Sequence, residues 1–154
     1  MNRMNPHAMN RRLLLTAALG IGAGVVARPA FATADELQAA IATFAGGAPV
    51  RAGRVNLAVA PLVENGNSVP VTLTVQSPMT AADHVKAIAV FNERNPQREV
   101  VVFRLGPRAG RAVVATRIRL ATSQQLVAVA QMSDGTFWSH TVDVIVTLAA
   151  CVEA

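Results

Sequence analysis

The chain of 154 residues has a single cysteine, Cys151, one tryptophan and no tyrosine. One cysteine has no internal partner, so the sequence excludes a fold held together by disulfides. The small number of aromatic residues leaves few rings on which single-stranded nucleic acid could stack. The histidines also stand apart from one another and from any cluster of acidic residues. Because a metal site needs several converging ligands, the sequence predicts no metal site.

Catalytic patterns are scarce as well. His84 and His140 each stand alone, and turn chemistry explains acidic residues such as Asp134. The segment 106–111 looks superficially like a phosphate-binding loop, but it lacks the Lys-Ser/Thr ending and precedes a strand pattern. A group of arginines could guide an anion or an acidic partner, although a solvated strand face is the default interpretation: Arg104, Arg108, Arg111, Arg117 and Arg119. We therefore predict that the protein is not an enzyme.

Residues 1–32 have the features of a cleaved signal peptide. Arg11 and Arg12 precede a stretch without charge from Leu13 to Ala27, and Ala30-Phe31-Ala32 resembles a cleavage site. The paired arginines favour the twin-arginine export route, and an ordinary Sec signal that carries two arginines is the alternative. We expect the mature protein to start at Thr33 in the periplasm, without membrane insertion.

The charge of the chain depends on this leader. Ten of the 14 basic residues and all nine acidic residues lie beyond residue 32, so the net charge falls from +5 to about +1. A nearly neutral domain lacks the strong basic field that nucleic-acid binding requires. The remaining residues, about 122 of them, are enough for one domain with one core.

One short helix is predicted at the start of the mature chain. Thr33 and Glu36 form a capping box, apolar residues follow at helical spacing up to Phe44, and Gly46-Gly47 ends the run. Beyond it the periodicity changes to two. Apolar segments bounded by turn signals predict about seven strands, at 55–59, 71–75, 85–91, 100–105, 113–120, 126–132 and 138–148.

These elements predict an all-β fold, an immunoglobulin-like antiparallel β-sandwich with one N-terminal helix. We expect this domain to span residues 33–148. In the last strand, Val142, Val144, Val146 and Leu148 share one face.

A flexible C-terminal arm is predicted for residues 149–154, with the sequence Ala149, Ala150, Cys151, Val152, Glu153 and Ala154. An unpaired cysteine in an exported protein is either a reactive group or an intermolecular one. An inert thiol, or one that only forms a disulfide-linked dimer, is the alternative. Glu153 discourages ionisation of the thiol, while the arm offers access to it.

Several segments resemble the SoxY family, the sulfur-carrier subunit of the periplasmic Sox thiosulfate-oxidation system. The matching segments occur in the family's order: Glu64-Asn65-Gly66, Val69-Pro70-Val71, Ser77-Pro78-Met79-Thr80, Thr116 to Ala121, and Gln131 to Gly135. The resemblance implies a heterodimer with a SoxZ-like subunit. It also implies a cysteine that holds the sulfur substrate covalently, and Cys151 is the residue that matches it. The other implied partners are enzymes like SoxAX, SoxB and SoxCD.

The arm departs from the family pattern. The family cysteine lies between two glycines on each side, whereas Cys151 lies between Ala149-Ala150 and Val152-Glu153-Ala154. Alanine restricts the backbone more than glycine does, so the arm could extend the last strand or form a helical turn. Two hypotheses follow. The first is a covalent carrier that uses Cys151, and the second is a β-sandwich interaction subunit that has lost or changed the carrier chemistry.

Overall fold

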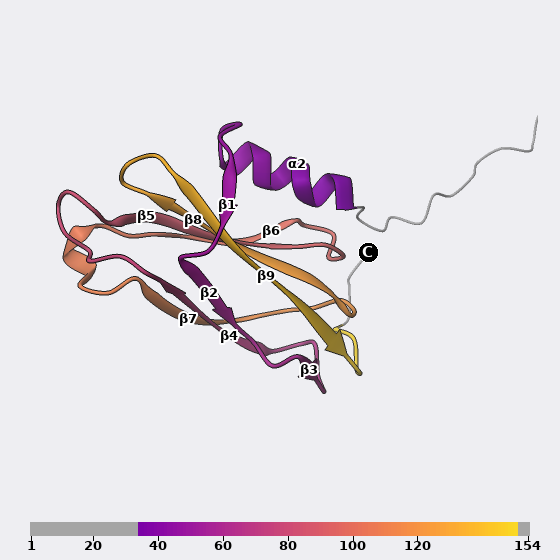
Figure 1. The fold of residues 1–154 in the computed structure, drawn as a ribbon. Coiled ribbons are helices and arrows are strands. Elements are labelled where there is room, and N and C mark those ends of the chain that lie inside the picture. Colours follow the sequence, from indigo (N-terminus) through magenta and orange to yellow (C-terminus); the bar gives the residue numbers. More distant parts are fainter. Residues whose placement is uncertain (1–33, 151–154) are drawn as a thin grey trace, which may run out of the picture.

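The computed structural model describes residues 34–150 (Figure 1). The predicted signal peptide and residues 151–154 of the predicted arm, Cys151 included, lie outside the described residues. The elements are helix α2 (Ala34–Phe44), strands β1 (Val50–Ala52), β2 (Val55–Ala58), β3 (Leu62–Val63), β4 (Val69–Val75), β5 (Val85–Asn92) and β6 (Glu99–Arg104), the 3-10 turn η1 (Pro107–Ala109), and strands β7 (Val113–Ile118), β8 (Gln124–Met132) and β9 (Phe137–Val146).

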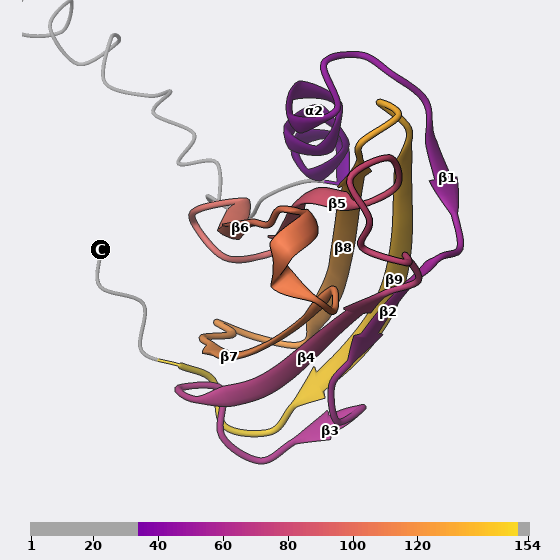
Figure 2. The same cartoon turned by 90° about the vertical axis from the view of Figure 1, so that its left-hand side faces the viewer.

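Two sheets form a sandwich. The larger sheet has the order β1-β9-β8-β5-β6 with β3 on the free edge of β9, and the smaller sheet has the order β2-β4-β7. Figure 2 shows the smaller sheet lying across one face of the larger sheet, while α2 lies against the other face. The immunoglobulin-like β-sandwich with one N-terminal helix, predicted from the periodicities, is confirmed.

The fold thus has three layers, which are α2, the larger sheet and the smaller sheet, and the burial of each strand follows from its place among them. In β4, Val69, Val71, Leu73 and Val75 are buried, and the residues between them face outward. In β5, by contrast, every residue except Lys86 is buried, because the larger sheet is covered on both faces. The apolar run in β5 therefore needs no alternation, whereas β4 has one solvated face.

Helix α2 covers the outer face of β5 and β8. Leu37 and Ile41 are buried there in a second core cluster that includes Phe91 and Phe137. The ring of Phe44 packs edge-on against both aromatic rings, with centroid distances of 5.8 and 6.0 Å. The helix ends at Phe44, as the glycine pair predicts, since Gly46 and Gly47 have positive φ angles of 60° and 78°.

The sandwich is not wholly antiparallel, and this corrects the sequence prediction. β1 and β3 were not predicted, and both pair in parallel with the same edge of β9. Strands of three and two residues carry no measurable alternation. Their extended conformation comes from hydrogen bonds to β9, a strand more than 80 residues away in the sequence, which no local pattern reveals.

The end of the last strand also differs from the prediction. β9 stops at Val146, and Leu148 is 61% exposed instead of lying on the buried face. The chain bends here because the Thr147 hydroxyl donates a hydrogen bond to the Glu64 carbonyl oxygen at 3.1 Å. The Leu148 amide bonds to the same carbonyl oxygen at 3.2 Å. These contacts turn Leu148 away from the core.

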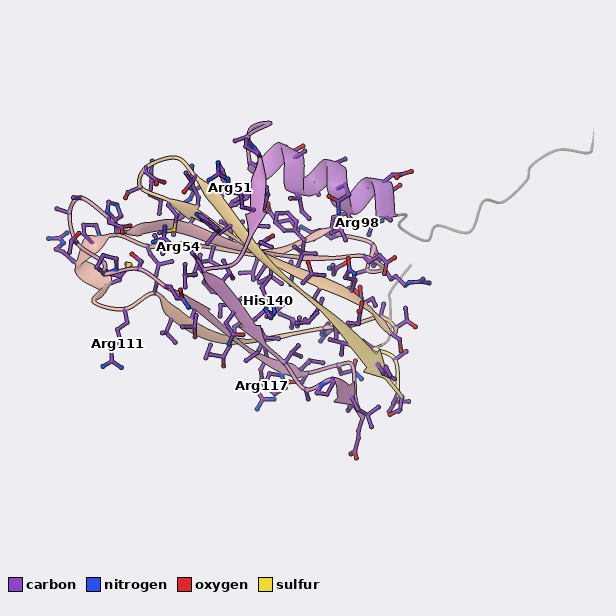
Figure 3. All side chains as sticks on the ribbon, viewed as in Figure 1. Arg51, Arg54, Arg98, Arg111, Arg117 and His140 are labelled. Carbon is purple, nitrogen blue, oxygen red and sulfur yellow. The ribbon has the colours of Figure 1, made fainter. Side chains whose placement is uncertain are left out.

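His140 joins the two sheets. The amide of Leu57, on the free edge of β2, donates a hydrogen bond to Nδ1 of His140 at 3.0 Å, and Figure 3 shows His140 on β9 beside β2. An accepting Nδ1 places the ring proton on Nε2. His140 is therefore a structural residue that satisfies an edge amide which no neighbouring strand reaches.

We expect His140→Ala to lower the free energy of unfolding by about 1–2 kcal/mol, because the part-buried Leu57 amide loses its acceptor. Urea denaturation followed by circular dichroism measures the change. His84→Ala is the matched control with a smaller expected loss, since the His84 ring bonds to the Thr80 carbonyl oxygen at an exposed position. Equal losses in the two variants would contradict the proposed role of His140.

Candidate functional site at the base of the C-terminal arm

The last described residue, Ala150, is held in place by a backbone hydrogen bond. The amide of Ala150 donates a hydrogen bond to the Leu120 carbonyl oxygen at 3.1 Å. Ala150 is buried, while Ala149 before it is exposed. Through Ala150 the chain neither extends β9 nor forms a helical turn. Within the predicted arm, Ala150 is thus held against the sandwich, directly before Cys151.

Gly66 packs against the same residues, Leu120 and Ala150, and also bonds to Leu148. Its amide donates to the Leu148 carbonyl oxygen, and its carbonyl oxygen accepts from the Leu120 amide, both at 2.8 Å. A Cβ atom on Gly66 would lie 2.3 Å from the Leu120 carbonyl oxygen and 2.9 Å from the Ala150 nitrogen. Three segments therefore meet at a distance that only glycine permits. We call Gly66, Leu120, Leu148 and Ala150 the arm base.

The loop that carries Leu120 is itself anchored. The side chain of Asn95 donates to the Arg119 carbonyl oxygen at 2.8 Å and accepts from the Ala121 amide at 3.0 Å. The buried Gln124 side chain donates to the same Asn95 oxygen at 2.8 Å. Paired polar groups of this kind hold a loop in one conformation. These bonds therefore fix the position of the Leu120 carbonyl oxygen, which accepts the hydrogen bond from the Ala150 amide.

An open pocket of about 320 Å³ lies beside this loop, between the start of β6 and Arg119. Asn92, Asn95, Gln97 and Glu99 supply most of its polar lining. Arg119 is its one basic side chain among those lining residues, and Glu99 is its one acidic side chain. The pocket therefore carries no strong charge of either sign.

The arginine group that the sequence singles out does not form one cluster. Figure 3 shows Arg111 at the end that lies away from the arm base, and Arg117 nearer to the arm base. Arg117 donates a hydrogen bond to the Ser68 hydroxyl at 3.2 Å. The structure does not bring the five arginines together as one anion site.

Two arginines outside the group singled out from the sequence lie against the lone tryptophan. The guanidinium groups of Arg51 and Arg54 are 5.9 and 5.7 Å from the centroid of the Trp138 ring. Arg54 also forms an ion pair with Asp83 at 3.7 Å. In the neighbouring turn, hydrogen bonds from the Thr136 hydroxyl and amide hold the pKa of Asp134 below its ordinary value. These contacts stabilise the local structure around Trp138 and the neighbouring turn.

Among residues 34–150, no three side chains of histidine, aspartate, glutamate or cysteine lie together as metal ligands would. Within the same residues, no helix has the length and apolar character needed to cross a membrane. Among the described residues, the arm base is therefore the feature that comes directly before the only cysteine of the sequence.

Fold and site together define a small two-sheet β-sandwich with one covering helix and a single cysteine in its sequence. The chain belongs to the SoxY family, because the family model of sulfur oxidation protein SoxY matches residues 41–151. No curated protein sequence matches the chain.

Among solved structures, the chain is similar to the sulfur carrier protein SoxY from Chlorobium limicola f thiosulfatophilum, with 29% sequence identity and a TM-score of 0.64. That match covers 75% of this chain and 100% of the other. A superoxide reductase (neelaredoxin) from Ignicoccus hospitalis is 16% identical, with a TM-score of 0.55 over 76% of this chain and 95% of the other. A putative superoxide reductase from Thermotoga maritima is 20% identical, with a TM-score of 0.52 over 67% of this chain and 89% of the other. The two superoxide reductases show the fold alone.

Proposed function

We propose that this protein is a periplasmic sulfur carrier that holds thiosulfate-derived sulfur covalently on Cys151. The observation that carries the proposal is the extent of the family match. It runs to residue 151, so the only cysteine of the chain is its last matched residue. The solved SoxY structure that resembles this chain is described as a sulfur carrier.

The chemistry requires only the thiol of this chain. In loading, the Cys151 sulfur forms a bond to the outer sulfur of thiosulfate. The thiol proton leaves to water, and two electrons pass to an oxidised haem enzyme of the SoxAX type. In unloading, a SoxB-type hydrolase adds water to the sulfonate sulfur. The bond between that sulfur and its neighbour breaks, sulfate leaves, and the electron pair stays on the persulfide of Cys151. A SoxCD-type dehydrogenase then oxidises the remaining sulfane sulfur to a sulfonate, which takes three oxygen atoms from water, releases six protons and passes six electrons to an oxidised cytochrome.

The partners follow from the same proposal. A SoxZ-like subunit forms the heterodimer, and the Sox-type enzymes act on the arm in turn. Export by the twin-arginine route would deliver the carrier to the periplasm. In this scheme the protein presents its sulfur to other active sites and catalyses no turnover itself.

The second candidate is a non-carrier interaction subunit, and one observation favours it. Ala150 is buried and hydrogen-bonded in the residue position directly before Cys151, which leaves fewer free residues for an arm that enters another protein. In that case the sandwich and its partner surface would be retained without carrier chemistry.

Intact mass spectrometry tests the proposal. The mature protein is incubated with thiosulfate, a SoxAX-type enzyme and an oxidised cytochrome, and its mass is compared before and after treatment with a reductant. We expect a reducible adduct on Cys151 with the mass of a thiosulfate group. A thiol that remains free, or that forms only dimers, would support the non-carrier alternative.

A further inference from the structure

Strand β6 has a free edge. It pairs with β5 on one side, and among residues 34–150 no strand pairs with its other side. The Leu105 amide donates a hydrogen bond to the Lys86 carbonyl oxygen. In an antiparallel ladder the alternate residues, Val102 and Arg104, therefore direct their main-chain groups away from β5. Such a row of main-chain groups is a template for a further strand.

The other sheet edges are protected. The short strands β1 and β3 cover the outer edge of β9, and the His140 ring accepts the hydrogen bond of the Leu57 amide on β2. Strand β7 alternates exposed and half-buried residues and carries the exposed charge of Arg117. In β6, by contrast, the four consecutive apolar residues 100–103 are all half-buried. Natural proteins cover or charge an edge of this kind.

The two charged residues of β6 share one face. Glu99 lies opposite Phe91 in the pairing with β5, and Arg104 lies opposite Ala87. Phe91 and Ala87 are four positions apart, so their side chains leave β5 on the same face. Because residues directly opposite one another also share a face, Glu99 and Arg104 point to the same side of the sheet. An odd separation of five positions permits this because Val100 has no partner on β5 and forms a bulge.

These charges make β6 complementary to itself. Glu99 begins the strand, Arg104 ends it, and both side chains are exposed. Within residues 34–150 neither of them forms an ion pair. When two copies of β6 run antiparallel with Val102 at the centre, Glu99 of each copy lies across from Arg104 of the other.

We propose that β6 pairs antiparallel with β6 of a second copy of this chain, around a two-fold axis at Val102. The pairing satisfies the outward main-chain groups and covers the apolar edge, and the larger sheet then continues through both copies. An ion pair between Glu99 and Arg104 at each end sets the register. A two-fold axis repeats every contact, so this interface closes on itself and forms a dimer.

The dimer is compatible with the rest of the molecule. None of the arm-base residues belongs to β6, and Figure 2 shows β6 on the side of the sandwich opposite to β1. A SoxZ-like subunit would bind another surface of each copy. The inference does not depend on the chemistry of the thiol.

Sedimentation equilibrium of the mature protein tests the proposal, with a reductant present so that no disulfide joins two Cys151 thiols. We expect a dimer. In each of two variants, Glu99→Arg and Arg104→Glu, we expect its dissociation constant to rise about tenfold, because like charges then face one another at both ends. An equal mixture of the two variants should return to the parental value, since opposite charges face one another again in the mixed dimer. Arg111→Glu reverses an exposed charge outside β6 and should leave the dimer unchanged.

Circular dichroism checks that each variant is folded, and recovery in the mixture is a result that a local defect of either variant would not give. A parental protein that sediments as a monomer overturns the inference, and so does a dimer with the same dissociation constant in both charge-reversal variants. The thiosulfate adduct on Cys151 decides the proposed function separately. A monomer that acquires the adduct contradicts only this inference, whereas a dimer without the adduct supports it and contradicts only the carrier function.

Discussion

Cys151→Ser abolishes the reducible thiosulfate adduct if this protein is a carrier. Serine retains the size and polarity of the side chain, but its oxygen cannot form the sulfur–sulfur bond on which loading depends. Because Cys151 is the only cysteine, no other residue of the chain can substitute for it. The expected effect is therefore complete loss of loading, measured by intact mass spectrometry after incubation with thiosulfate and a SoxAX-type enzyme.

The same variant separates the two candidate functions. The free energy of unfolding should stay within about 0.5 kcal/mol of the parental value, because residue 151 follows the last buried residue of the described core. A carrier then becomes inactive while it still binds its SoxZ-like partner. Sulfur oxidation that continues at the parental rate with Cys151→Ser in place would contradict the carrier function and support an interaction subunit.

Gly66→Ala is expected to have the largest effect on the structure of the site. The added Cβ would lie 2.3 Å from the Leu120 carbonyl oxygen, and a backbone atom cannot rotate away as a side chain can. One of the three segments in the arm base must move, which we expect to lower the free energy of unfolding by about 1–3 kcal/mol. Since the Ala150 nitrogen is the next nearest atom at 2.9 Å, its hydrogen bond to Leu120 should weaken as well.

Gly106→Ala is the matched control for this effect. Gly106 has a φ angle of −145°, and a Cβ atom there would meet no atom within 4 Å. Its free energy of unfolding should change by less than about 0.5 kcal/mol. Urea denaturation measures both variants, and the modification rate of Cys151 by a small disulfide reports on the arm base. Equal stability in the two variants would show that Gly66 is not needed to hold the arm.

Much of the fold follows from local patterns in the chain. The alternation in β4 and the continuous apolar run in β5 both predict the observed strands, and the glycine pair predicts the end of α2. Each pattern is legible because the spacing of apolar residues in the sequence depends on whether an element is buried on one face, on two faces or along one stripe. The single cysteine and the ordered SoxY-like segments also indicate the family, which the match over residues 41–151 confirms.

The site was less predictable. The sequence Asn65-Gly66 predicts an ordinary turn. The structure contains this turn, in which the Asn67 amide donates a hydrogen bond to the Asn65 side chain at 2.9 Å. Nothing in that dipeptide indicates that Gly66 also contacts Leu120 and the residues after β9. His140 likewise reads as an isolated histidine, although its ring accepts the Leu57 amide from a residue 83 positions away.

The sequence by itself determined the β-sandwich, the helix that covers it and the identity of the one thiol, because hydrophobic periodicity and residue counts are local properties of the chain. Only the tertiary structure decided where the arm begins. The Ala150 amide finds its acceptor on Leu120, and the space for that contact exists because Gly66 lacks a side chain. These residues are distant in sequence and meet only when both sheets have formed, since a backbone hydrogen bond depends on the position of both partners and not on the identity of either.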